Sequence, residues 1–241
     1  MRPILKSGFS FLAAGIVGIG SESLAAPPFS SPIPLEKGNC WNYEGKIETT
    51  LAGSATVYST NIAWDMVIVD SMQSTNVQAA VVRGFLDELP WYEPGCVPGF
   101  CVLLNFSNRV YRLNEPDADR AAALMRAAMA QPGKFSAQTL DSDERFVLPL
   151  ARDKRWGGDV ERKDGWYCWH VEQEQTAKLQ IKGVTEHHPF TVFSIAYRTN
   201  PDHLIVDIAP GLGITRFVYA HHGTVATVQV RLVSFEYPHS F

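Results

Sequence analysis

The sequence predicts a mainly β fold, a curved antiparallel sheet or half-barrel meander with one α-helix packed on it. Three observations predict this class. Most segments are rich in Val, Ile, Thr and aromatic residues and are broken by Gly, Pro and Asn, which is typical of strands. One stretch, at about residues 115–131, has small and apolar side chains at helical spacing. Over the last 50 residues, apolar and polar side chains alternate as in an antiparallel sheet with one covered face.

The composition excludes several protein classes. The chain has 241 residues, 46% of them hydrophobic and 19% charged, which is typical of a globular domain and excludes disorder and collagen-like repeats. There are 21 basic and 25 acidic side chains and no cluster of Lys or Arg. A nucleic-acid partner is therefore not expected.

The N-terminal segment has the pattern of a secretory signal peptide. Arg2 and Lys6 provide a positive start, an apolar run covers residues 9–20, and Ser23 and Ala25 fit a signal-peptidase site. The alternative is a membrane anchor, but a spanning helix needs about 20 apolar residues. We therefore expect residues 1–25 to be removed, no membrane span in the mature protein, and a periplasmic or extracellular location.

Behind this leader, we expect a Pro-rich extended lead-in over residues 26–36, outside the core, and a single β-rich domain over residues 37–241. Within the domain, the expected strands cover residues 40–50, 63–70, 77–86, 100–106, 109–113, 145–150, 165–172, 177–184, 190–199, 203–209, 213–221 and 224–237. The segment 77–86 also fits a helix, since Asn76 could cap one.

One helix is expected between these strands. Asn114 or Asp117 can cap it, and Pro116 suits its first turn. An apolar stripe then runs along one face, and it predicts core packing rather than a ligand groove. The dipeptide at 132–133, Pro-Gly, is expected to stop the helix.

The last four strands have the clearest pairing pattern. Ile195 and Val206 belong to alternating apolar sets that any loop with an even number of residues places on one face. The dipeptide at 222–223, His-Gly, predicts a two-residue hairpin turn, which would pair Tyr219 with Ala226.

Four cysteines in an exported chain predict two disulfides. A type II turn at Pro98-Gly99 would place Cys96 opposite Cys101. Cys40 and Cys168 would then form the second pair. A metal site or a redox-active pair made by the four thiols is the alternative, but the chain has no CxxC motif.

The segment 87–95 is the candidate ligand-binding loop. Trp91, Tyr92 and Glu93 combine aromatic surface with a carboxylate, which suits a sugar ring or a peptide partner. In the alternative interpretation, the two aromatic side chains anchor the loop on the domain. Asp87, Glu88 and Glu93 could also serve as an acid/base pair in an exported hydrolase acting on glycans.

No other pattern identifies a catalytic or metal centre. Ser194, His203 and Asp207 share one face of a predicted hairpin, which we interpret as a polar outer face. His187 and His221, with Glu186, are the weak alternative for a metal-binding surface. We expect no catalytic residues and no cofactor.

Three segments resemble a known type of protein. Residues 37–43 (KGNCWNY) resemble the GNxWxY opening of uncharacterised exported bacterial β-rich proteins, and residues 209–214 (APGLGI) resemble the APGxGI step before their final hairpin. The loop 89–95 (LPWYEPG) is the third segment. The resemblance implies a curved antiparallel sheet of the lipoprotein-carrier type and carries no catalytic residues. The cysteines at positions 40, 96 and 101 depart from that pattern.

The sequence therefore predicts an exported, disulfide-containing, non-enzymatic protein that binds a small apolar ligand or a protein partner on a sheet face. The alternatives are the exported hydrolase and the His-rich metal-binding protein.

Overall fold

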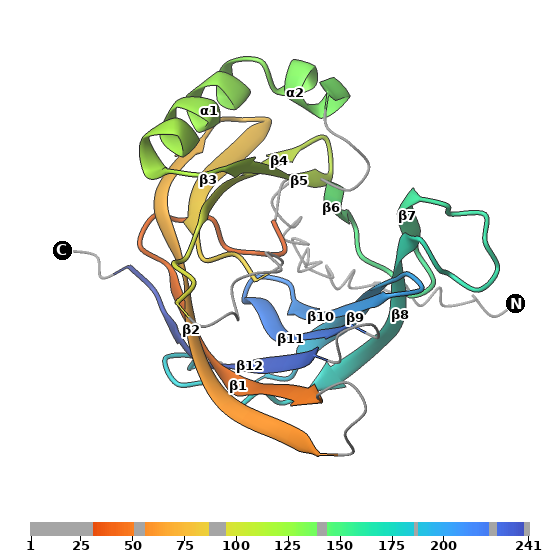
Figure 1. Cartoon of the computed structure of the whole chain (residues 1–241). Helices are drawn as coiled ribbons and strands as arrows, with labels where there is room; N and C mark the ends of the chain where they lie inside the picture. The colour runs from red at the N-terminus through yellow and green to blue at the C-terminus, as the bar shows by residue number, and fades with distance from the viewer. Residues whose placement is uncertain are drawn as a thin grey trace, which may run out of the picture.

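The computed structural model describes residues 31–50, 56–86, 95–138, 144–185, 188–221 and 226–238. These residues form one antiparallel sheet of twelve strands in the order β6-β5-β4-β3-β2-β1-β12-β11-β10-β9-β8-β7 (Figure 1). The mainly β fold predicted from the sequence is thus confirmed. The strands are β1 (Cys40–Thr50), β2 (Val57–Gln73), β3 (Val77–Arg83), β4 (Phe100–Phe106), β5 (Arg109–Glu115), β6 (Glu144–Val147), β7 (Arg155–Gly158), β8 (Cys168–Ala177), β9 (Phe190–Arg198), β10 (Asp202–Ala209), β11 (Gly213–His221) and β12 (Ala226–Glu236).

The sheet curves into two facing layers because β2 belongs to both. This strand has 17 residues, of which Val57 to Val67 pair with β1 and Val67 to Gln73 pair with β3. The first layer therefore continues from β2 through β1 and β12 to β7, and the second continues through β3 to β6. In Figure 1, β2 bends around one side of the molecule between the two layers.

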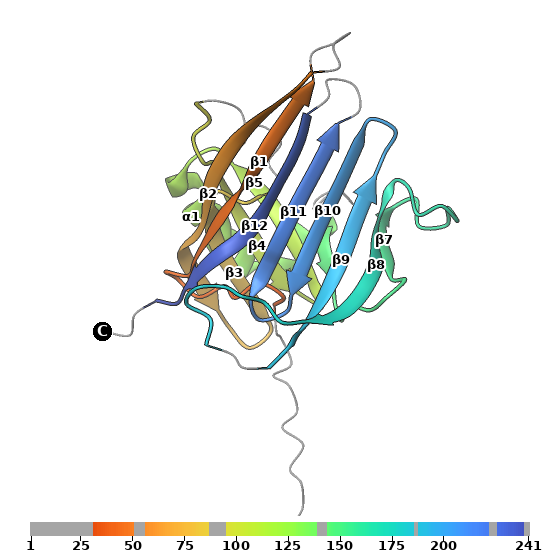
Figure 2. The same ribbon diagram turned by 90° about the horizontal axis from the view of Figure 1, so that it is seen from below.

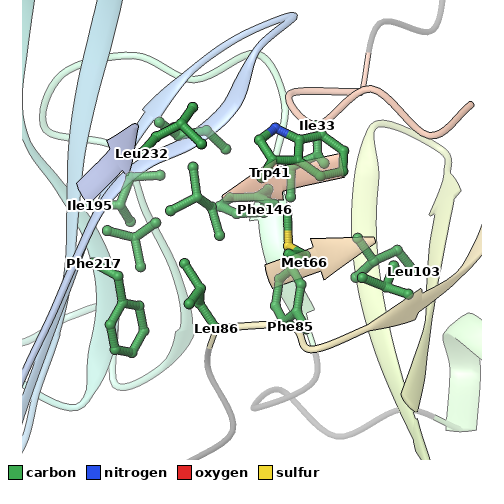
Figure 3. Close-up of a cluster of buried hydrophobic side chains, with 14 of the residues drawn as sticks. Ile33, Trp41, Met66, Phe85, Leu86, Leu103, Phe146, Ile195, Phe217 and Leu232 are labelled. Atoms are coloured by element: carbon green, nitrogen blue, oxygen red, sulfur yellow. The ribbon is translucent and has the colours of Figure 1, made fainter. Parts of the chain in front are cut away.

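A packed apolar core fills the space between the layers. Side chains from both layers point toward one another there, among them Trp41, Met66, Leu103 and Phe217 (Figure 3). A cavity of only about 10 Å³ remains between Phe85, Phe146, Trp169, Val206, Ile214, Phe217 and Arg145. That volume holds at most about one water molecule. The interior at this place is therefore a core and not a ligand chamber.

Residues 31–36 of the lead-in contribute to this core, although the whole lead-in was expected to lie outside it; residues 26–30 are not among the described residues. Ile33 and Leu35 are 0% and 1% exposed, and both belong to the core cluster. Burying each of these side chains gains about 1.5–3 kcal/mol, which favours docking of the segment over a solvated linker.

The second layer is covered on its outer side by α1 (Ala118–Ala130). Asp117 caps the helix, since its carboxylate accepts a hydrogen bond of 2.9 Å from the backbone N–H of Arg120. Ala121 and Met125 are buried against β3 and β4. A second helix, α2 (Pro132–Gln138), follows where a stop was expected. Proline is tolerated in the first turn of a helix, so Pro132 begins a new helix instead of only ending the first.

The pairing of the C-terminal strands was predicted in part. Between β9 and β10, Ile195 lies opposite Val206, as predicted. Between β11 and β12, the predicted register is wrong, because Tyr219 lies opposite Val228 and the strands end at His221 and Ala226. A shift of two residues keeps every side chain on its face, so the predicted apolar and polar faces remain correct.

The structure also decides the secondary structure of three other segments. Residues 77–83 form strand β3, and a helix there is excluded. Residues 178–184 form no strand, but Lys182 makes an isolated parallel bridge to Ser234. Strand β7, with glycines at 157 and 158, was not predicted, because four residues give too short a pattern.

The two ends of the sheet approach each other at β6 and β7. The indole Nε1 of Trp156 on β7 donates a hydrogen bond of 3.2 Å to the backbone carbonyl of Glu144 on β6. The sheet order places the two strands at opposite ends, so a side chain connects them where no ladder of backbone bonds does.

In the described part of the chain, neither helix has the length and apolar character required to cross a membrane.

Candidate binding surface

Within the described ranges, no helix covers the outer face of the first layer. Figure 2 looks directly onto this face, with β1, β12, β11, β10 and β9 in front and α1 behind the second layer. Side chains alternate along each strand, so residues between the inward-facing core positions point to this outer face. On β1, for example, Trp41 and Tyr43 are buried in the core, whereas Glu44, Lys46 and Glu48 are exposed.

A hollow of about 800 Å³ lies over β1 and its two neighbours, β2 and β12. Its lining contains two acidic and two basic side chains, three neutral polar side chains, and small or apolar residues. The lining residues are Glu44, Gly45, Lys46, Glu48, Asn61, Ile62, Ala63, Thr227, Gln229, Val230 and Arg231.

Glycine at position 45 is required by the close approach of β1 and β12. A Cβ atom at Gly45 would lie 1.9 Å from the carbonyl oxygen of Gln229 and 2.7 Å from the Cα atom of Val230. Both are backbone atoms, so a side chain could be accommodated only by moving a strand. The path of the two strands that border the hollow therefore depends on this residue.

The strand register places the polar lining residues in two rows across the hollow. In one row, Glu44 lies opposite Arg231 on β12 and Ala63 on β2. In the next row, Lys46 lies opposite Gln229 and Asn61. The small Ala63 thus lies beside the longer side chain of Glu44.

The charged side chains that line the hollow form no ion pairs with one another. Among the hydrogen bonds and ion pairs of the described residues, none involves the side chains of Glu44, Lys46, Glu48 or Arg231. Even the directly opposed pair of Glu44 and Arg231 forms no ion pair. These groups are exposed and available to a ligand.

Two other pairs of charged side chains on the first layer do form ion pairs. Arg216 donates a 2.9 Å hydrogen bond to the carboxylate of Asp207, which is 7% exposed. Arg198 donates two hydrogen bonds, of 2.9 and 2.8 Å, to the carboxylate of Glu172.

Ser194, His203 and Asp207 do not form a catalytic triad. Ser194 Oγ donates a 2.5 Å hydrogen bond directly to Asp207, whose other carboxylate oxygen binds Arg216. His203 instead lies 3.3 Å from Arg198 and packs edge-on against Trp166. The interpretation of these residues as part of a polar outer face fits this geometry.

His221 faces a carboxylate rather than a cluster of metal ligands. Its Nδ1 lies 2.5 Å from Oδ1 of Asp202, which also accepts a 2.7 Å hydrogen bond from Tyr219. Burial alone would raise the pKa of Asp202, but these hydrogen bonds outweigh it and lower the pKa. Within the described residues, no group of three His, Cys, Asp or Glu could hold a metal ion. His187 and Glu186 lie outside the described residues.

The two predicted disulfides are not formed, although all four cysteines lie in the described ranges. Instead of closing a turn onto Cys96, Cys101 lies opposite Val82, and the carbonyl of the preceding Gly99 accepts a 2.9 Å hydrogen bond from Gly84. The second pair fails for a topological reason. Cys40 begins β1 and Cys168 begins β8, and four strands separate these two in the sheet.

The candidate ligand loop lies outside the described residues. This applies to Trp91, Tyr92 and Glu93, and also to Asp87 and Glu88, the carboxylates considered for glycan hydrolysis. Their expected roles remain predictions.

Sequence reasoning did not find the hollow. The alternating acidic, basic and acidic residues at positions 44, 46 and 48 within a predicted strand were the available signal. The alternation alone does not identify a binding site. The strand register is needed to show that Arg231 and Asn61 lie beside these charges.

Comparison with known proteins yields structural neighbours only. No family model matches the chain, and no curated protein matches its sequence. A proposed exported protein with a YmcC-like fold from Bacteroides fragilis aligns with a TM-score of 0.41 and 12% identity, over 87% of this chain and 99% of that one. A proposed lipoprotein from Parabacteroides distasonis aligns with a TM-score of 0.43 and 9% identity, over 86% and 99% of the two chains.

Proposed function

We propose that this protein is an exported, non-catalytic binding protein whose ligand or partner occupies the hollow over β2, β1 and β12. The observation that carries the proposal is the set of exposed charged side chains that line the hollow and make no ion pairs with one another. Opposite charges directly across two strands normally stabilise a sheet by about 0.2–1 kcal/mol. Leaving them unpaired keeps them available for a bound molecule.

The packing of the interior argues against the version of this function in which the sheet encloses an apolar ligand. The core side chains meet across the two layers, and the cavity between them holds about one water molecule. The hollow, in contrast, is open and polar. We therefore assign binding to the outer face and to a polar ligand or protein partner.

Export is supported by the sequence of residues 1–25, with its basic start, apolar run and small residues before the expected cleavage site. N-terminal sequencing of the protein purified from the bacterial envelope or medium tests this part. We expect a mature chain that begins at Ala26, and an intact N-terminus would contradict it.

The binding function can be tested by blocking the hollow. Ala63 is exposed and lines the hollow beside the longer side chain of Glu44, so Ala63→Trp would fill the space. Val160→Trp places the same side chain on an exposed loop outside the lining and serves as the control. The probes are arrays of synthetic peptides and of bacterial glycans. We expect a class of probe that binds the wild type and Val160→Trp but binds Ala63→Trp at least tenfold more weakly. Absence of binding, or equal binding by all three proteins, would contradict the proposal.

A further inference from the structure

We infer that the occupant of the hollow is an extended polypeptide segment in which basic, acidic and basic residues occupy every second position. This inference rests on the proposed binding function and specifies its ligand.

The spacing of the charges on β1 carries the inference. Glu44, Lys46 and Glu48 are exposed on the same face of one strand, and successive members are two residues apart. Two residues of a strand span about 6.8 Å. A second extended chain lying over β1 repeats its own side chains at that same interval. A segment of the type Lys-x-Glu-x-Lys therefore places each charge next to its opposite, and it does so in either chain direction.

The strands beside β1 add hydrogen-bonding groups in register with these charges. Asn61 on β2 and Gln229 on β12 lie on either side of Lys46. Amide side chains both donate and accept hydrogen bonds, as the backbone of a bound peptide requires. Neither amide has a hydrogen bond to another of the described side chains.

The composition of the lining disfavours other ligand classes. Two acidic and two basic side chains balance, whereas a polyanion such as a nucleic acid requires a positive surface. Among the described residues, the lining contains no Trp, Tyr or Phe, so this part of it lacks the aromatic surface on which a sugar ring would pack.

A segment that lies over β1 would be recognised through side chains and not through backbone hydrogen bonds to β1. Both edges of β1 are already paired, with β2 and with β12. Strand addition requires an exposed sheet edge, which β1 lacks. Binding through exposed charges should weaken as salt is added, because the Debye length falls from about 10 Å at 0.1 M to about 3 Å at 1 M ionic strength.

A charge exchange tests the inference. The variant with Glu44→Lys, Lys46→Glu, Glu48→Lys and Arg231→Glu inverts every charge in the hollow but keeps the net charge and the opposed signs at positions 44 and 231. The probes are two peptides with blocked ends, one centred on Lys-Thr-Glu-Thr-Lys and the other on Glu-Thr-Lys-Thr-Glu. We expect the wild type to bind the first peptide at least tenfold more tightly, and the variant to show the reverse preference. Circular dichroism and thermal unfolding check that the variant is folded.

Lys46→Glu alone provides a second test that changes one exposed side chain and does not depend on folding of the fourfold variant. We expect it to lose the preference for the first peptide. Equal affinity of the wild type for both peptides would overturn the inference, as would a preference that neither folded variant changes. If Ala63→Trp abolishes binding of a glycan while neither peptide binds, the hollow is a binding site and only the inference fails. If Ala63→Trp weakens the binding of no probe, both the inference and the proposed function fail.

Discussion

The indole nitrogen of Trp41 donates a hydrogen bond of 2.6 Å to the backbone carbonyl of Leu212, which lies 171 residues further along the chain. The hydroxyl group of Tyr43 donates a second bond, of 3.0 Å, to the carbonyl of Ile214. Both side chains are buried. The two sequence segments that resemble motifs of exported β-rich proteins are thus joined inside the core. Burial and these two hydrogen bonds account for Trp41 and Tyr43.

Replacing Trp41 by Phe tests the contribution of the first bond. Trp41→Phe keeps an aromatic ring but leaves the buried carbonyl of Leu212 without its donor. We expect the free energy of unfolding to fall by at least about 1–3 kcal/mol, the cost of an unsatisfied buried polar group. Urea denaturation followed by circular dichroism measures it. Trp166→Phe is the control, since that half-buried ring contacts His203 edge-on, and it should cost less than Trp41→Phe.

Gly45→Ala should destabilise the protein strongly. Its Cβ atom would lie within 2 Å of a backbone oxygen on β12, so β1 and β12 must separate locally. We expect a loss of more than about 2 kcal/mol in thermal or urea unfolding, above the usual effect of a surface substitution. Gly133→Ala is the matched control. No atom lies within 4 Å of its Cβ position, and there the change should be neutral or stabilise by about 0.4–1 kcal/mol. Similar effects at the two positions would contradict the close approach at Gly45.

Asp202 should make stability depend on pH in the acidic range. Its hydrogen bonds from His221 and Tyr219 lower its pKa in the folded protein below the ordinary value of 3.8. Above about pH 5 the carboxyl group is ionised in both states, and its full stabilisation is present. As the pH falls further, the unfolded chain binds the proton first, and the stabilisation is lost. Thermal unfolding of the wild type and Asp202→Asn should differ most above about pH 5 and converge as the pH falls through the lowered pKa of the folded protein. A constant difference would show that Asp202 does not titrate in this way.

The four cysteines should be recovered as thiols. We expect alkylation of all four when the purified protein is denatured without reductant, as measured by mass spectrometry. In the native protein, Cys40 and Cys168 should react slowly, because burial raises the pKa of both thiols and the thiolate is the reactive form. A disulfide-linked pair of peptides in the non-reduced digest would contradict the structure.

The elements predicted correctly are those specified by local patterns. The strand over residues 100–106 and the helix that Asp117 caps follow from residue type and spacing. In the last four strands, strict alternation of apolar and polar residues shows which side chains share the apolar face. These features depend on neighbours within a few residues, so a single sequence is sufficient to find them.

The features that were missed depend on distant parts of the chain. The hairpin after His221 was predicted two residues too short, because a histidine-glycine pair fits a tight turn but does not require one. The disulfides were inferred from a turn, but Gly99 forms its hydrogen bond with Gly84 on another segment. The hollow requires residues near positions 45, 62 and 230 to meet, which only the complete order of strands establishes.

The indole contact between Trp156 and Glu144 has a consequence for how the molecule unfolds. In a fully closed cylinder every strand is paired on both sides, whereas here no backbone ladder joins the terminal strands β6 and β7, and side-chain contacts connect them. Amide hydrogen exchange in β6 and β7 should accordingly be faster than in β1 or β12, each of which is paired on both sides. We therefore expect unfolding to begin at β6 and β7. The strands that carry the hollow, β2, β1 and β12, should be among the last to separate.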